Sequence, residues 1–236
     1  MLAFAAQANA RLIYVSTAFV HPRDGHTFNQ YELSKRAAEV LIRQSEVPTT
    51  IVRPSIIIGD SRSGVSCKQQ GIHRVIRLLL HDLLPAVPGA ATSKLDLIPQ
   101  DQVAEAIIGL LRHGVTGGDY WLTAGNAALS LDMGLELVAQ QASRLLNKPV
   151  SKPRLVDPTA FGRLLGQTLL PTLPPVARQR VEASMSLFPF IHMANPFPSS
   201  FAQLRQQIGL PGLPDPQLTF QRNLDYIVRY TEARQG

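Results

Sequence analysis

The chain has 236 residues, of which 45% are hydrophobic and 17% charged, so it can bury a core and is not intrinsically disordered. Its formal net charge of +6 favours anionic ligands, but the basic residues are spread along the chain, which argues against nucleic-acid binding. No run of about 18 apolar residues occurs, so we expect no membrane span. The single cysteine, Cys67, excludes an internal disulfide, is expected to be a small semi-buried residue, and suits the reducing cytoplasm.

The first 60 residues alternate between strand-like and helix-like patterns. Residues 1–10 are expected to be the end of a helix, and RLIYVS at 11–16 predicts a short strand. QYELSKRAAEVLIRQ at 30–44 has apolar residues at helical spacing, and TTIVRP at 49–54 predicts a buried strand that ends at its proline. This alternation is typical of the α/β class.

The pattern continues to about residue 150. The expected elements are a helix over about 68–84, a strand at 95–99, a helix from Asp101, a strand at 119–125 and a helix at 130–148. Asp101 and Ser130 stand where a side-chain oxygen caps a helix start, so both are predicted N-caps.

Prolines become frequent after residue 150, and the remaining elements look like separate helices rather than strand–helix pairs. The last helix is expected at 215–233, opened by Asp215 and Pro216. We therefore predict an α/β domain over 1–150 and a mainly helical appendage over 151–236.

Thr17, Tyr31 and Lys35 could form a site for carbonyl reduction. Four residues are about one helical turn, so Tyr31 and Lys35 point from the same face of the 30–44 helix. A nearby ammonium favours the phenolate form, which lets the tyrosine exchange a proton with a carbonyl oxygen. Thr17 ends the preceding strand and could hold the same oxygen.

Other motifs carry weaker signals. GDSRSG at 59–64 is one residue out of step with a nucleophile elbow, so it is expected to be a loop. His73 and His81 could share a helix face, but no carboxylate completes a metal set, so solvated or capping histidines are expected and no metal site is predicted. The apolar stretch 187–198 is expected to be a packed linker, or else the wall of an acyl pocket or a peripheral membrane contact.

Four stretches together resemble the extended short-chain dehydrogenase/reductases, in the branch of fatty acyl-CoA and thioester reductases with male-sterility-type NAD-binding domains. They are YVSTAFV (14–20), FNQYELSKRAAE (28–39), VRPSIIIGDSRSG (52–64) and LDLIPQDQVAEAI (95–107). The resemblance covers about residues 1–125. It implies the C-terminal part of a Rossmann-like doubly wound sheet with a helical substrate-binding appendage.

The resemblance also implies roles for individual residues. Thr17 would orient the substrate carbonyl, Tyr31 would be the general acid/base, and Asn29 would lie near the site. The residues implied to contact the nicotinamide cofactor, NADP(H) by family habit or NAD, are Tyr31, Lys35, Pro54, Ile56 and Ile57.

The sequence departs from the family in two ways. No Gly-rich turn for a pyrophosphate precedes the 11–16 strand, because GLPGLP at 209–214 is broken by prolines, so we expect a fragment, a misplaced start or a degenerate copy whose sheet has a bare edge. The segment 21–27 looks like a shortened substrate loop.

The function expected from the sequence is NAD(P)H-dependent reduction of an acyl thioester in cytoplasmic lipid metabolism. Two alternatives stay open, namely another extended short-chain enzyme, such as a nucleotide-sugar epimerase or hydroxysteroid dehydrogenase, and a non-catalytic copy of the fold. The expected partner is a small-molecule substrate, and the sequence leaves the oligomeric state open.

Overall fold

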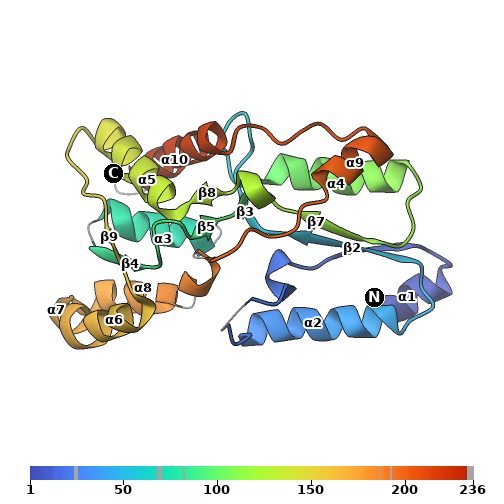
Figure 1. The fold of residues 1–236 in the computed structure, drawn as a ribbon, viewed down its shortest axis with the longest axis horizontal. Helices are drawn as coiled ribbons and strands as arrows, with labels where there is room; N and C mark the ends of the chain where they lie inside the picture. The colour runs from blue at the N-terminus through green and yellow to red at the C-terminus, as the bar shows by residue number, and fades with distance from the viewer. Residues whose placement is uncertain (24–25, 68–70, 82, 186, 192, 233–236) are drawn as a thin grey trace.

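The computed structural model describes residues 1–23, 26–67, 71–81, 83–185, 187–191 and 193–232. Figure 1 shows two parts side by side along the long axis. One part is a sheet with helices on both faces, and the other is built mainly from helices with short strand pairs.

The central sheet is parallel, with strand order β1 (Leu12–Val15), β2 (Thr49–Pro54) and β7 (Asp119–Leu122). Side chains alternate between its faces. Val52 and Tyr120 lie in the core with α4 (Gln100–Arg112) and α9 (Phe201–Ile208), whereas α2 (Gln30–Arg43) covers the opposite face. The strand–helix alternation therefore produces the layered α/β arrangement that was expected.

Strand β1 forms one edge of this sheet and follows a short helix, α1 (Leu2–Gln7). Among the described strands it pairs only with β2. Val15 is 40% exposed, whereas its partner Val52 is 0% exposed. The bare sheet edge expected from the sequence is thus present in the described part of the chain.

In the described residues three short strand pairs lie outside the central sheet. They are β3 (Ile56–Ile58) with β6 (Leu97–Pro99), β4 (Ala86–Pro88) with β9 (Arg154–Val156), and β5 (Lys94–Leu95) with β8 (Leu129–Ser130). The first two pairs are parallel and the third is antiparallel. Strand β9 is a short exception within the region after residue 150 that was expected to be mainly helical, and its three residues pair with β4.

The helices of the second part surround one hydrophobic core. They are α3 (Gly71–Leu80), α5 (Leu131–Leu146), α6 (Pro158–Arg163), α7 (Leu170–Thr172), α8 (Pro175–Met185) and α10 (Pro216–Glu232). Helix α10 packs on α5 and α3. Helix α9 packs on the central sheet, whereas α3 and α5 lie in the second core. The domain boundary expected near residue 150 stays a prediction.

The helix starts test the capping predictions. Ser130 caps α5 by accepting from Met133 N at 3.2 Å, and Asp215 accepts from Leu218 N at 2.8 Å. The N-cap prediction for Asp101 is wrong, because α4 begins one residue earlier with Pro99 at the N-cap. The Asp101 carboxylate instead accepts from Ser61 N at 2.8 Å and from Ser61 Oγ at 2.6 Å.

This tether predicts a stability effect at Ser61. Ser61→Ala removes a hydroxyl donor from a part-buried carboxylate, and a hydrogen bond to a charged group contributes about 1.5–3 kcal/mol. We expect the urea unfolding free energy to fall by about 1–2 kcal/mol. An unchanged free energy would show that Asp101 acts only on its own helix.

Candidate active site

Thr17 lies just beyond the carboxyl end of β1. It is 4% exposed and is the N-cap of a single 3₁₀ turn, η1 (Ala18–Val20), where its Oγ1 accepts from Phe19 N at 3.4 Å. The cap uses the hydroxyl as an acceptor, so its proton remains available for a second oxygen. Thr17 is therefore held in place at the end of the strand where the sequence predicted it.

The start of α2 is fixed by a buried carboxylate. Asn29 and Glu32 form a capping box, with Glu32 N donating to Asn29 Oδ1 at 3.0 Å and Asn29 N donating to Glu32 Oε2 at 2.8 Å. Glu32 is 0% exposed, and its carboxylate also binds Arg23 and His26. Asn29, expected near the site, thus shapes the helix start beside Tyr31.

Tyr31 and Lys35 lie on the first two turns of α2. Tyr31 is 49% exposed, and its ring meets the edge of Phe190 at 6.2 Å between centroids. Lys35 Nζ donates to Val15 O at 3.0 Å and lies 5.2 Å from the centroid of the Tyr14 ring. Burial raises the pKa of Tyr14, and the nearby Glu39 and Tyr31 add to the effect.

The three candidate catalytic side chains therefore gather where β1 ends and α2 begins. Lys35 is anchored to Val15, two residues before Thr17. Within the described residues no direct hydrogen bond joins Thr17, Tyr31 and Lys35, so the geometry brings them to one corner without linking them. Their catalytic roles stay predictions.

Pro54, Ile56 and Ile57 continue from the same edge of the sheet. Pro54 ends β2 and is buried, while Ile56 and Ile57 are half-buried in β3 opposite Leu97 and Ile98. Half-exposed Tyr31 and the Lys35 ammonium are of the chemical kinds that bind the ribose and nicotinamide end of a dinucleotide, and these two roles stay predictions. The described residues contain no Gly-rich turn that would hold a pyrophosphate, so the fit extends to that end only.

Asp96 is a buried acid that the sequence did not single out. It is 0% exposed, and its carboxylate accepts from Ala124 N at 2.8 Å and Gly125 N at 3.0 Å. Burial raises the pKa of Asp96 against the opposing effect of these backbone bonds. Since Ile56 N donates to Asp96 O at 3.3 Å, this residue fixes the turn after β7 next to β3.

A cluster of charges on the α2 face of the sheet was also missed. Arg53 is buried and binds Glu39 through Nε at 2.8 Å and Nη2 at 2.6 Å, and it also binds Asp119 at 2.9 Å. Arg43 pairs with Asp119 at 2.5 Å. These groups come from α2, β2 and β7, so only the folded chain brings them together.

The cluster predicts a stability loss in acid. Burial raises the pKa of Glu39, but the bonds from Arg53 outweigh burial and hold it below the ordinary 4.5. Burial also raises the pKa of Asp119, but its bonds with Arg43 and Arg53 outweigh burial and hold that pKa below the ordinary 3.8. The unfolded state then binds more protons, so the stabilisation is complete above about pH 4.5 and is lost as the pH falls through the lower folded-state values.

We therefore expect the urea midpoint of the wild type to fall between about pH 5 and pH 3. Glu39→Gln removes one of the titrating groups and is expected to reduce that dependence on pH, whatever its effect on stability at neutral pH. Equal slopes for the two proteins would contradict the assignment.

Aromatic rings form a wall beside Thr17 and Tyr31. Phe19 meets Phe190 at 4.7 Å and Phe197 at 5.2 Å, and both contacts are edge-to-face. Met193 completes this small buried cluster. Phe190, Met193 and Phe197 of the stretch 187–198 thus supply apolar surface beside the candidate site, whereas Phe188 packs in the second core. Residue 192 lies outside the described residues, and the expected roles of the stretch as a linker or a pocket wall stay predictions.

The remaining sequence candidates do not form sites. GDSRSG is a loop in which Asp60 Oδ1 accepts from Ser63 N at 2.8 Å. His73 is buried rather than solvated, whereas His81 lies past the end of α3 and is exposed, so the two do not share a face. Cys67 is exposed, which corrects the expected semi-buried position.

Two further kinds of feature are absent from the described residues. No group of three or more His, Cys, Asp or Glu side chains is placed to hold a metal ion in that part of the chain. None of the helices described combines the length and the apolarity needed to cross a bilayer. Residues 24 and 25 of the shortened loop lie outside the described residues.

The parallel sheet with helices on both faces is a Rossmann-like α/β fold. Residues 1–107 match the model of an NAD-binding domain family described as Male sterility protein. The matched residues include all the candidate catalytic and cofactor-binding positions. The resemblance seen in the sequence, and with it a nicotinamide cofactor, is confirmed for this part of the chain.

Solved structures share the fold. The terminal R domain of the myxalamid PKS-NRPS biosynthetic pathway has a TM-score of 0.66 at 20% identity, covering 94% of this chain and 58% of its own. An R domain of a nonribosomal peptide synthetase from Mycobacterium tuberculosis gives 0.61 at 19%, covering 94% and 61%. UDP-glucuronic acid 4-epimerase from Bacillus cereus, in complex with NAD, gives 0.61 at 13%, covering 97% and 65%.

These coverages mean that the chain spans about three fifths of the lengths of these structures. No curated protein matches the sequence. The fold class predicted from the sequence is confirmed, whereas the substrate and the reaction are not determined by similarity at this level of identity.

Proposed function

We propose that this chain is the catalytic and substrate-binding part of an NADPH-dependent reductase of acyl thioesters. The observation that carries the proposal is the placement of Thr17 at the end of β1 and of Tyr31 and Lys35 on the first turns of α2, inside the segment that matches the male sterility family. A bound nicotinamide would supply hydride to the thioester carbon. The preference for NADPH over NADH follows the family habit.

Each residue has a task that its contacts support. Tyr31 has an exposed phenol and delivers a proton to the carbonyl oxygen as negative charge develops there. Lys35 is held on Val15 O, one helical turn after Tyr31, and adds positive charge to the site. Thr17 is fixed by its role as the cap of η1 and donates its hydroxyl proton to the same oxygen.

The apolar wall favours a substrate with a hydrocarbon part. Phe190 meets Tyr31 on one side and Phe19 on the other, so the surface next to the reacting phenol is aromatic. An acyl chain is more compatible with this surface than the polar sugar of a nucleotide-sugar substrate. The apolar surface therefore favours an acyl thioester over the nucleotide sugar of an epimerase. It does not distinguish the acyl thioester from a hydroxysteroid, which is also apolar.

Separate assays with a thioester, a nucleotide sugar and a steroid distinguish the proposed function from its alternatives. NADPH oxidation is followed with hexadecanoyl-CoA, NAD⁺ reduction with a 3β-hydroxysteroid, and conversion of UDP-glucuronate to its C4 epimer in the presence of NAD⁺, because epimerisation causes no net change in NAD⁺. Because the chain spans 58% of the first structure, the assay includes a form extended upstream of Met1. Turnover of the thioester alone supports the proposal. Turnover of the sugar or the steroid alone identifies an alternative, and no turnover in either form leaves a non-catalytic copy of the fold.

A further inference from the structure

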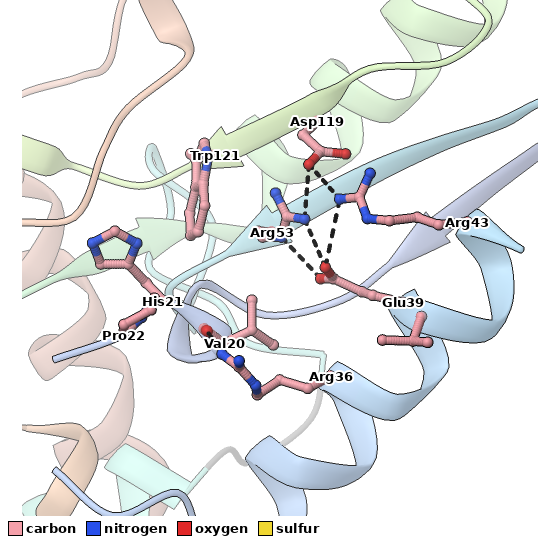
Figure 2. Close-up of a pocket in the computed structure, with 10 residues that line it drawn as sticks. Val20, His21, Pro22, Arg36, Glu39, Arg43, Arg53, Asp119 and Trp121 are labelled. Carbon is pink, nitrogen blue, oxygen red and sulfur yellow. Dashed lines mark hydrogen bonds and ion pairs between the residues drawn. The ribbon is translucent and has the colours of Figure 1, made fainter.

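A hollow of about 330 Å³ lies between α2 and β7, on the α2 face of the central sheet (Figure 2). Its lining includes Arg36 of α2, Arg53 of β2 and Trp121 of β7, together with Val20 and His21 from the segment after Thr17. None of Thr17, Tyr31 and Lys35 lines it. The hollow is therefore distinct from the three candidate catalytic side chains, and Trp121 lies between it and the aromatic cluster around Phe19.

The charges of the hollow do not balance. Its carboxylates, Glu39 and Asp119, are already bound by Arg53 and Arg43 (Figure 2). Arg36 has no carboxylate partner among the described residues. Its guanidinium donates one hydrogen bond, to Val20 O at 2.7 Å, and lies 4.3 Å from the centroid of the Phe28 ring.

This arrangement leaves Arg36 with donors to spare. A guanidinium carries five N–H donors in a planar fork that matches a carboxylate. The backbone bond and the Phe28 ring fix the orientation of the fork at the rim of the hollow. An anion with two coplanar oxygens is the partner that this geometry favours.

Trp121 supplies a flat apolar wall. The Arg53 guanidinium lies 4.7 Å from the indole centroid, and His21 meets the indole edge-on at 5.3 Å. Burial lowers the pKa of His21, and Arg23 and Arg53 lower it further, so the imidazole is neutral at pH 7. The indole is only partly covered, which leaves ring surface for a flat ligand.

We propose that this hollow is a binding site for a small aromatic carboxylate, with the carboxylate on Arg36 and the ring against Trp121. The volume matches the lower end of the range for small-molecule sites. A metal cation does not fit, because both carboxylates are neutralised by arginines. The proposal does not depend on the proposed function, because its test reads binding rather than turnover.

Trp121 is the only tryptophan of the chain, so its indole N–H gives one signal in a ¹⁵N–¹H spectrum. The probe is 2-naphthoate, with the uncharged 2-naphthamide as its isostere. Binding is measured for the wild type, Arg36→Gln and Arg11→Gln. Arg11 is a matched control, because it is exposed and donates to a backbone carbonyl, Leu111 O, at 2.8 Å.

We expect 2-naphthoate to shift the indole signal saturably, with a Kd of about 1 mM or lower. The amide and the Arg36→Gln variant should each bind about tenfold more weakly or worse, whereas Arg11→Gln should match the wild type. The other amide signals report whether each variant folds. If Arg36→Gln does not fold, Arg36→Lys, which keeps the charge and loses the fork, takes its place with the same expected direction.

Three results overturn the proposal. The first is the absence of a saturable shift in the wild type, and the second is equal affinity for the naphthoate and the naphthamide. The third is an equal loss of affinity in the Arg36 and Arg11 variants, which would mean that only the net charge of the protein attracts the anion.

Discussion

Tyr31→Phe is expected to lower the single-turnover rate of thioester-dependent NADPH oxidation by about 10²–10⁴-fold, the range for loss of a general acid. The half-exposed ring would keep its edge contact with Phe190, so the change removes the phenolic proton and little packing. The extended form is the enzyme to assay. NADPH affinity, measured by nicotinamide fluorescence, should change by less than about threefold.

Tyr14→Phe is the matched control. Tyr14 also carries a phenol close to Lys35, and the change keeps the ring on which the ammonium lies. We expect its turnover to stay within about threefold of the wild type. If Tyr14→Phe abolished turnover and Tyr31→Phe did not, the acid would be assigned to the wrong tyrosine.

Arg53→Met is expected to lower the free energy of unfolding by about 3–5 kcal/mol, because it leaves the buried Glu39 carboxylate with only the 3.8 Å contact to Arg43. The Arg53 side chain is 5% exposed and that of Glu39 is 10% exposed, so water cannot replace the lost bonds fully. Methionine keeps an unbranched apolar chain in the same place. Urea unfolding measures the change.

Arg43→Met separates burial from charge. Arg43 belongs to the same cluster, but its side chain is 51% exposed, so its removal should cost about 1 kcal/mol or less. The double variant Arg53→Met with Glu39→Met should recover part of the loss, since no buried charge is then left alone. Equal costs for the two arginines would contradict the role given to burial.

The sequence predicted those strands and helices whose formation depends on interactions between residues that are close in the chain. The strands at 12–15 and 49–54 and the helix at 30–43 follow from apolar spacing and end where Pro54 or a polar run ends them. Strand β9 could not be predicted, because three residues have no periodicity of their own and are ordered by pairing with β4. The N-cap prediction for Asp101 was wrong for a similar reason, because its carboxylate accepts hydrogen bonds from Ser61, which is 40 residues away in the sequence.

The candidate site also contains residues that the sequence could predict and residues that only the fold brings together. Thr17, Tyr31 and Lys35 could be placed from the sequence because a strand end and one helical turn determine their relative positions. Glu32 was predictable in principle, since Asn29 followed three residues later by Glu is a capping signature. The bonds of Arg53 with Glu39 and Asp119 join residues 14 and 66 positions apart, so only the tertiary fold discloses them.

The measurement that tests the central claim most directly is hydride transfer from NADPH deuterated at C4 of the nicotinamide to hexadecanoyl-CoA. Mass spectrometry of the aldehyde or alcohol detects the deuterium. The reaction is run with the 236-residue chain and with the form extended upstream. We predict that deuterium appears on C1 of the product with wild-type protein and that Tyr31→Phe forms labelled product about 10²–10⁴-fold more slowly. A folded extended form that binds NADPH and transfers no deuterium to C1 would contradict the reductase assignment.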